Sequence, residues 1–339
     1  MRGPLLRIIL PTCSRIHPPR RAVTSPSEAL LLSAAVDVSV VIPCYNQARY
    51  LPEAIDSVDA GARSVEVIVV DDGSTDGTAG VAASFAHVRT IRQENQGLAA
   101  ARNTGLAHAR GRYVLFLDAD DRLLPGAVEC GARALDDHPA CAMTYGRCVM
   151  MGPDGHPWPT PRVPRVDRDH HAALLRQNVI WMPAMAMFRR EALAQVGGFA
   201  RGFDAAADYD LYLRVTRRWP AHDHGVRVAA YRRHAANMSG NASRMLRETL
   251  AVMQRHLPSN PDVAEAWPEG CRAWRDFYGT QLVEEIRAHL RQRETAAALR
   301  KTLTLARFHP SRVVRELARK AHLAAVRRRR GLRLSSPSV

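Results

Sequence analysis

The segment YVLFLDADD, residues 113–121, decides the fold of this chain. Its first five residues are apolar or aromatic, which is typical of a strand buried on both faces. Three carboxylates, Asp118, Asp120 and Asp121, then follow within four positions, where that strand would leave the sheet. Carboxylates that close repel one another unless a cation or a proton lies between them. A polar turn that caps a helix starting near Pro125 would use the same residues, so this segment alone leaves both interpretations open.

Strand-like and helix-like segments alternate before this segment. The apolar, β-branched segments are residues 38–43, 66–72, 88–93 and 113–118. The segments with helical spacing are residues 50–58, 78–86 and 97–109. Continuous apolar strands that alternate with helices predict an α/β fold, with a mainly parallel sheet flanked by helices.

Each predicted strand is followed by polar residues. These are Tyr45 and Asn46 after the first strand, Asp71 and Asp72 after the second, Asn95 after the third, and Asp118 and Asp120 after the fourth. In a parallel sheet the carboxyl ends of the strands meet at one edge, which is where such sheets bind ligands. We therefore predict a shared ligand site at this edge rather than four independent caps.

The pattern changes after residue 151. Residues 152–165 are rich in Pro and Gly, which favours a loop, and a helix is expected near 169–176. Residues 181–199 continue as an apolar strand and a short helix that ends at a Gly pair. From about residue 245 the chain has successive helical patterns.

The net charge of +15 is located at the two ends of the chain. Residues 287–339 hold 15 Lys and Arg against two acids, and residues 1–36 hold five Arg against one Glu, which leaves residues 37–286 with a net charge of −2. A near-neutral centre without zinc-ligand spacing or interleaved aromatic and basic residues argues against a nucleic-acid-binding protein. We expect residues 1–36 to be a disordered basic leader, although an organelle transit peptide has the same composition.

The sequence indicates neither a membrane-spanning segment nor a set of disulfide bonds. No run approaches the roughly 18 apolar residues of a membrane span. The six cysteines are scattered without a CxxC pair, so we expect reduced thiols and a cytoplasmic protein.

Three stretches together resemble the nucleotide-binding half of family 2 glycosyltransferases with the GT-A fold. They are VSVVIPCYNQARYLPEAIDSV (38–58), VEVIVVDDGSTDGT (65–78) and ENQGLAAARNTGLAHARGRYVLFLDADD (94–121), and weaker similarity continues to about Ser239. The resemblance implies an inverting enzyme that moves a sugar from a nucleoside diphosphate sugar, UDP-linked in our interpretation, to a hydroxyl of a glycan or lipid-linked acceptor.

The resemblance also implies a domain organisation. We expect a GT-A domain over 37–240, with a nucleotide-binding half over 37–125 and an acceptor half over 126–240. A helical basic region would follow over 241–330, and a flexible tail over 331–339.

The resemblance implies a site for a divalent cation, Mn²⁺ or Mg²⁺. Asp118 and Asp120 have the DxD spacing that supplies the carboxylate oxygens such hard cations prefer. His234, in YRRHAANMS (231–239), would complete the metal site. Arg232, Arg233 and Ser239 would lie near the phosphates, and Asp121 would be a cap or an outer neighbour of the metal.

The resemblance places further residues around the nucleotide, with Asp72 accepting a hydrogen bond from the base. The other predicted nucleotide-binding residues are Pro43, Tyr45, Asn46, Asn95, Gly97, Arg102 and Asp118. The stretch DDGSTDGT also fits a tight turn with a helix cap, and Arg102 and its neighbour Asn103 would otherwise face solvent.

The catalytic base is expected in GGFARGFDAAADYDLYLRV, residues 197–215. The resemblance assigns to Asp208 the removal of the proton from the acceptor hydroxyl. Ala207 stands where the family usually has Glu, which puts acceptor binding in doubt. A helix cap is the alternative for Asp208 and, more strongly, for Asp210. A nucleotide-sugar-binding protein with weak or no turnover, or another nucleotidyltransferase-like α/β enzyme, therefore stays an alternative, although the loop after the first strand lacks a Gly-rich phosphate cradle.

The basic C-terminal segments also have two interpretations. Residues 297–308 and 311–330 carry apolar residues at helical spacing with Arg and Lys between them. Such helices pack on a core with a solvated basic face, or they lie on anionic lipid. Peripheral contact with the inner face of a membrane is our second hypothesis for this region.

Overall fold

The computed structural model describes residues 36–257, 263–316 and 318–319. The expected leader, the run of four Arg at 327–330 and the expected tail lie outside the described residues, apart from residue 36. The described chain from residue 36 onward belongs to one compact unit. The domain boundary expected at residue 240 stays a prediction.

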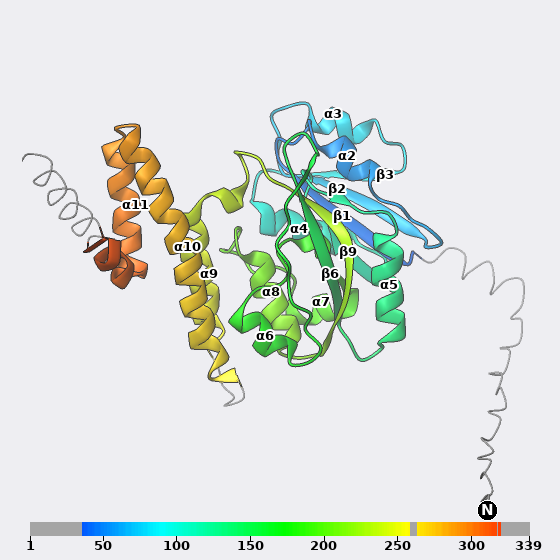
Figure 1. The fold of residues 1–339 in the computed structure, drawn as a ribbon. Coiled ribbons are helices and arrows are strands. Elements are labelled where there is room, and N and C mark those ends of the chain that lie inside the picture. Colours follow the sequence, from blue (N-terminus) through cyan, green and yellow to red (C-terminus); the bar gives the residue numbers. More distant parts are fainter. Residues whose placement is uncertain (1–35, 258–262, 317, 320–339) are drawn as a thin grey trace, which may run out of the picture. The chain divides into compact units, whose positions relative to one another are not determined.

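The elements carry the labels of Figure 1. The strands are β1 (Val38–Cys44), β2 (Val65–Asp71), β3 (Val88–Arg92), β4 (Tyr113–Phe116), β5 (Arg122–Leu123), β6 (Met143–Met151), β7 (Pro157–Trp158), β8 (Ala186–Arg189) and β9 (Ala221–Arg232). The helices are α2 (Leu51–Asp56), α3 (Thr78–Ala83), α4 (Leu98–His108), α5 (Ala127–Asp137), α6 (His170–Arg176), α7 (Arg190–Val196), α8 (Ala207–Thr216), α9 (Ala242–Arg255), α10 (Ala266–Arg291) and α11 (Thr295–Phe308). Two short 3₁₀ helices, η1 (Pro183–Met185) and η2 (Met238–Gly240), complete the set.

The strands form one mixed sheet in the order β3-β2-β1-β4-β8-β6-β9-β5, with β7 paired to β6. The first four strands are mutually parallel, β8 runs antiparallel to β4 and β6, and β9 is parallel to β6. Every residue of β1 is buried, as its unbroken apolar run predicts. The predicted α/β fold with a mixed, mainly parallel sheet and a helical C-terminal region is confirmed.

The strand expected at the start of residues 181–199 begins later than predicted. Pro183 opens η1, and pairing with β4 and β6 begins only at β8. Proline has no backbone N–H and therefore interrupts a ladder at this point.

The order of the strands reverses between β1 and β4. From β1 the chain builds outward through β2 to β3, and β4 then returns to the other side of β1. Helix α4 packs on β1 and β2 (Figure 1). Ligands bind at the carboxyl ends of strands that flank such a reversal, so the topology places a site beside Cys44 and Leu117.

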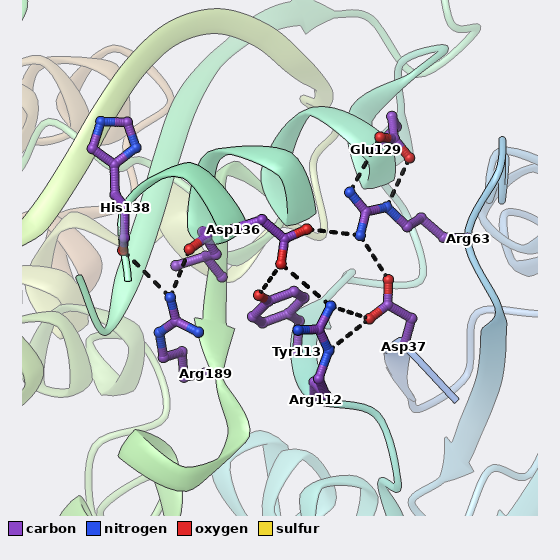
Figure 2. Close-up of polar contacts among 9 residues, drawn as sticks. Asp37, Arg63, Arg112, Tyr113, Glu129, Asp136, His138 and Arg189 are labelled. Atoms are coloured by element: carbon purple, nitrogen blue, oxygen red, sulfur yellow. Dashed lines mark hydrogen bonds and ion pairs between the residues drawn. The ribbon is translucent and has the colours of Figure 1, made fainter. Parts of the chain in front are cut away.

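An ion-pair network lies at the opposite, amino-terminal ends of β1 and β4 (Figure 2). Arg63 donates hydrogen bonds to Asp37 at 2.9 Å, to Asp136 at 2.8 Å and to Glu129 at 2.8 Å. The Tyr113 hydroxyl donates to the same Asp136 at 2.7 Å. Partly exposed pairs contribute little one by one, but a shared network stabilises the ends of several elements together. This network links α5 to the sheet at the edge opposite the carboxyl ends of the parallel strands.

The C-terminal helices pack on α6 and α8 and form a second small core. Helix α10 approaches α6 closely, because a Cβ added to Gly270 would lie 1.8 Å from the Leu175 carbonyl oxygen. An ion pair between Arg176 Nε and Glu269 Oε2, 2.9 Å apart, reinforces the contact. Among the described residues no helix is both long and apolar enough to span a bilayer. The cysteines in the described ranges are unpaired.

Candidate active site

The loops that follow β1 and β2 are tied to each other. Asn46, at a positive φ of 54°, accepts a hydrogen bond from the Thr75 backbone N–H at 2.8 Å, and its own N–H donates to Ser74 Oγ at 2.9 Å. Buried Asp71 accepts from the Ser74 N–H at 2.9 Å and pairs with Arg92 at 3.0 Å. Asn46 and Asp71 therefore hold the shape of the loops, and the Asn46 side chain is engaged within them.

Asp72 joins these loops to the segment that begins α4. One oxygen accepts from Gln93 Nε2 at 2.7 Å and from the Gln96 N–H at 2.9 Å, and the other accepts from the Gly97 N–H at 2.9 Å. Gly97 has a φ of +90°, which favours glycine. Asp72 is thus a buried anchor at the edge of the cavity.

Arg102 of α4 is buried beneath the acidic segment. Its Nη2 donates to Asp118 Oδ1 at 2.6 Å, and its guanidinium lies 5.2 Å from the centre of the Phe199 ring. Its Nε is buried without a hydrogen-bond partner among the described residues. Arg102 therefore acts as an internal positive charge beside the carboxylates rather than as a solvent-facing residue.

Asp120 and Asp121 are held by the segment after β9. His234 Nε2 lies 2.9 Å from Asp120 Oδ2, and the Arg232 backbone N–H donates to Asp121 Oδ1 at 2.7 Å. Burial raises the pKa of both carboxyl groups, and the negative charge of Asp118 raises them further. Three carboxyl groups thus crowd the exit of β4, as the sequence indicated.

Arg232 does not have the position expected of a phosphate neighbour. Its side chain is 1% exposed and donates to the Asp120 carbonyl oxygen at 2.7 Å and to Glu53 at 2.7 Å. Its guanidinium also lies 4.7 Å from the centre of the Tyr50 ring. Arg232 therefore braces the acidic segment from behind, and Arg233, the next residue, faces the cavity.

Asp208 lies in the first turn of α8. Its Oδ1 accepts from the Tyr209 N–H at 2.8 Å. Desolvation by the surrounding protein raises the pKa of Asp208 to about 6, although the positive charge of Arg102 acts in the opposite direction. A carboxylate with this pKa is ionised at neutral pH and is a stronger base than an ordinary Asp.

Two neighbours of Asp208 in α8, Ala207 and Asp210, are buried. Ala207, which stands where the resemblance implies Glu, belongs to α8 and is fully buried. Asp210 is also fully buried and pairs with Arg214 Nε at 2.7 Å and with His256 Nε2 at 3.0 Å. These partners lower the pKa of Asp210. Asp210 thus links α8 to the end of α9.

One cavity of about 1080 Å³ opens at the carboxyl edge of the sheet. The predicted site residues that line it are Pro43, Tyr45, Asp72, Asn95, Gly97, Arg102, Asp118, Asp120 and Asp208. Asn46 and His234 are not among the lining residues; the first shapes a loop and the second is hydrogen-bonded to Asp120. The residues from four separate strand exits and from α8 therefore share one space.

The donor set fits a hard divalent cation. Asp118 and Asp120 bring two carboxylates to the cavity, and oxygen ligands of this kind suit Mg²⁺ and Mn²⁺, which complete their coordination with phosphate and water. No group of three or more His, Cys, Asp or Glu among the described residues is arranged to hold a metal. His234 is hydrogen-bonded to Asp120, so its role as a third ligand stays a prediction.

Sequence reasoning missed the far wall of this cavity. Residues Trp274, Phe277, Tyr278 and Gln281 of α10 line it. Asp204 lines it too, and pairs with Arg244 of α9 at 3.2 Å. The helical spacing of these aromatic residues did not indicate a binding site, because an aromatic stripe on a helix usually belongs to a core.

Comparison with known proteins identifies the class. Residues 39–197 match the model of glycosyl transferase family 2. The chain is 30% identical to the chondroitin synthase of Escherichia coli over 207 residues, which are 57% of this chain and 28% of that protein. The first curated relatives are matched over 28% to 62% of their own length.

Two solved structures share the fold. One is Staphylococcus aureus TarS 1–349 in complex with UDP-GlcNAc, with a TM-score of 0.54, 18% identity and coverage of 68% of this chain and 69% of that one. The other is the mannosyltransferase PcManGT from Pyrobaculum calidifontis in complex with GDP-Man and Mn²⁺, with a TM-score of 0.55, 21% identity and 87% coverage of both chains. Residues 39–197 of this chain therefore match glycosyl transferase family 2, and the chain has the GT-A fold.

Proposed function

We propose that this chain is an inverting, cation-dependent glycosyltransferase. It moves a sugar from a nucleoside diphosphate sugar, UDP-linked, to a hydroxyl of a glycan or lipid-linked acceptor. The observation that carries the proposal is the single cavity onto which Asp72, the acidic pair Asp118 and Asp120, and Asp208 all open. Relatives named as polysaccharide synthases and neighbours solved with nucleotide sugars support it.

The donor side of the cavity binds and orients the nucleotide. Pro43 and Tyr45 follow β1 and offer a surface to the base and ribose, while Asp72 accepts a hydrogen bond from the base. Arg102 and Arg233 supply positive charge to the diphosphate end. Asp118 and Asp120 would hold a divalent cation, which when bound neutralises the charge that develops on the departing diphosphate.

Asp208 performs the proton transfer. Its carboxylate accepts the proton of the acceptor hydroxyl as the oxygen attacks the anomeric carbon, and the bond to the diphosphate breaks on the opposite face. One displacement by one base inverts the configuration at that carbon. The raised pKa of Asp208 suits this role, because a base works best when its pKa approaches the working pH.

The test is nucleotide release from purified protein. UDP-GlcNAc, UDP-Glc and GDP-Man are each supplied with Mn²⁺, with Mg²⁺ or with EDTA, with water in place of the acceptor hydroxyl. The released nucleoside diphosphate is measured for wild type and Asp208→Asn. We expect release from one of the UDP-sugars that needs the cation and is lost in Asp208→Asn. Nucleotide binding without release under every condition would instead support a binding protein without turnover.

We also infer peripheral contact of the cytoplasmic protein with an anionic membrane. On α11, Leu299 and Leu303 are 59% and 61% exposed, and Arg300 and Arg307 are exposed beside them. Residues four apart share one helix face, so this face presents leucine with arginine and no acid. Each basic residue near such a surface contributes about 1 kcal/mol, and the leucines add apolar burial.

Vesicle flotation tests this contact. We expect wild type to float with phosphatidylcholine vesicles that contain phosphatidylserine at low salt and to dissociate at high salt. The double variant Leu299→Ser, Leu303→Ser should lose binding, while Val226→Ser, which changes an exposed apolar residue of β9, should keep it. Flotation that is equal for all three proteins, or a leucine-dependent dimer in light scattering without vesicles, would contradict a lipid partner.

A further inference from the structure

Helix α10 forms a wall of the cavity that the predicted nucleotide-binding residues also line. It lies outside the segment that matches the family model, residues 39–197. We propose that this wall is the acceptor site and that it binds a pyranose ring of a glycan, with Phe277 as the stacking surface. The proposal rests on the proposed function, since it names the substrate class that Asp208 would deprotonate.

Phe277 has the position of a stacking residue. It lines the cavity and is 55% exposed, although apolar side chains of this size are normally buried in a helix packed on a domain. Trp274 and Tyr278 hold its ring edge-on, with centroids 6.3 and 5.0 Å away. The ring is thus fixed in orientation while much of its surface stays available. The C–H face of a pyranose packs well on such a ring, because the aromatic face is apolar and carries partial negative charge.

Tyr278 brings α10 to the catalytic carboxylate. It is 5% exposed and stacks on Trp274, with ring centroids 5.5 Å apart. Tyr278 and Asp208 line the same cavity. Burial raises the pKa of the Tyr278 hydroxyl, and the charge of Asp208 raises it further. The hydroxyl therefore keeps its proton at neutral pH.

The polar residues of the wall favour a sugar over an alkyl chain. The amide side chains of Gln177, Asn178 and Gln281 line the same cavity as Phe277. Amides lose their hydrogen bonds to water when a ligand covers them, and the hydroxyl groups of a sugar replace those bonds, whereas an alkyl chain does not. An aromatic surface with amides around it therefore matches the alternation of C–H faces and hydroxyl edges of a pyranose.

Helix α10 is fixed well enough to serve as a binding wall. The close approach at Gly270 sets its distance from α6, and Trp267 Nε1 donates to the Met253 carbonyl oxygen at 2.6 Å. Tyr209, next to the base, packs edge-on against Trp274 with centroids 5.6 Å apart. The base and the aromatic wall thus have a shared support, and a sugar on Phe277 would be held at a constant position relative to Asp208.

The experiment separates acceptor binding from donor chemistry. Methyl α- and β-glycosides of glucose, galactose, mannose, GlcNAc and GalNAc are probed with the full chain by saturation-transfer NMR and by their effect on nucleotide release. The variants are Phe277→Ala, Phe277→Tyr and, as a control in the last turns of the same helix, Leu290→Ala, whose side chain is 46% exposed. Release in the absence of glycoside reports donor use alone.

We expect at least one glycoside to bind wild type and to raise nucleotide release. Phe277→Ala should weaken this effect about tenfold. Phe277→Tyr and Leu290→Ala should behave as wild type. The proposal is overturned if no glycoside binds, if Phe277→Ala binds glycoside as wild type does, or if only octyl glycosides bind through Phe277, since these would report an alkyl-chain site. No nucleotide release from any donor, with glycoside binding intact, would instead reject the proposed function.

Discussion

The substitution Asp208→Asn should stabilise the protein while it removes turnover. The pKa of Asp208 is about 6 in the folded chain against 3.8 for an ordinary Asp, and each unit of that difference corresponds to about 1.4 kcal/mol. Keeping the carboxylate ionised at pH 7.5 therefore costs about 3 kcal/mol, or roughly 1 to 3 because the side chain has partial access to solvent. Asparagine carries no charge and keeps an oxygen for the Tyr209 N–H, so the cost disappears.

The pH dependence of this difference has a fixed sign. Near pH 4 the folded chain holds a proton on Asp208, so wild type and variant should have similar free energies of unfolding. Between about pH 4 and pH 6 the unfolded chain releases that proton and the folded chain retains it, so wild type loses stability relative to the variant as pH rises. Above pH 6 the difference is complete.

The assay is urea unfolding of protein in EDTA at pH 4, 5, 6 and 7.5, together with nucleotide release at pH 7.5. Turnover should fall by about 10² to 10⁴, the usual contribution of a positioned base. Asp210→Asn is the matched control on the same helix, because Arg214 and His256 lower the pKa of Asp210 and its ionisation stabilises the fold. The control should lose stability at pH 7.5. A variant at Asp208 that is no more stable than wild type at pH 7.5, or that turns over normally, would refute the reasoning.

Three further substitutions probe the supports of the site. Gly270→Ala places a methyl group against the Leu175 carbonyl oxygen, so the free energy of unfolding should fall by about 1 to 3 kcal/mol. Urea unfolding equal to that of wild type would show that α10 can shift without loss of stability. Arg102→Gln removes the partner of Asp118, so the free energy of unfolding should fall by about 1 to 3 kcal/mol and the KM for the donor should rise. Unchanged stability in urea unfolding would mean that the fold does not need this buried charge. Gly97→Ala forces alanine to a φ of +90°, so the affinity for the donor, measured by calorimetry, should fall about tenfold. Unchanged affinity would contradict a rigid segment at Gly97.

The parts of the fold that the sequence predicted are those encoded locally. The unbroken apolar run of β1 and the run that ends in Asp118 identify buried parallel strands, and parallel strands bring their carboxyl ends to one edge. The convergence of Asp72, Asp118 and Asp120 on one cavity follows from that geometry. The start of β8 was missed by a few residues, because Pro183 replaces part of the expected strand with a 3₁₀ turn.

The parts that the sequence did not predict depend on contacts between distant segments. Arg102 lines the cavity with the other predicted site residues, but no sequence pattern indicated that it would be buried against Phe199 and paired with Asp118. Arg232 and Arg233 are adjacent in sequence, and only the pairing of β9 decides that the first faces inward and the second faces the cavity. Neighbouring residues of a strand point to opposite faces of the sheet, but the sequence does not show which of the two residues faces the cavity.

The two sides of the cavity differ in how easily their residues can change. On the donor side, Asp72 and Gly97 are locked into hydrogen bonds between loops, so a substitution disturbs the sheet edge as well as the ligand. On the α10 side, the ring contacts that the structure describes for Phe277 are with Trp274 and Tyr278 of the same helix, so its replacement should leave the sheet edge unchanged. If α10 is the acceptor site, acceptor choice therefore depends on a helix outside the family-matched segment, and substitutions there should change the preferred acceptor while nucleotide preference stays the same.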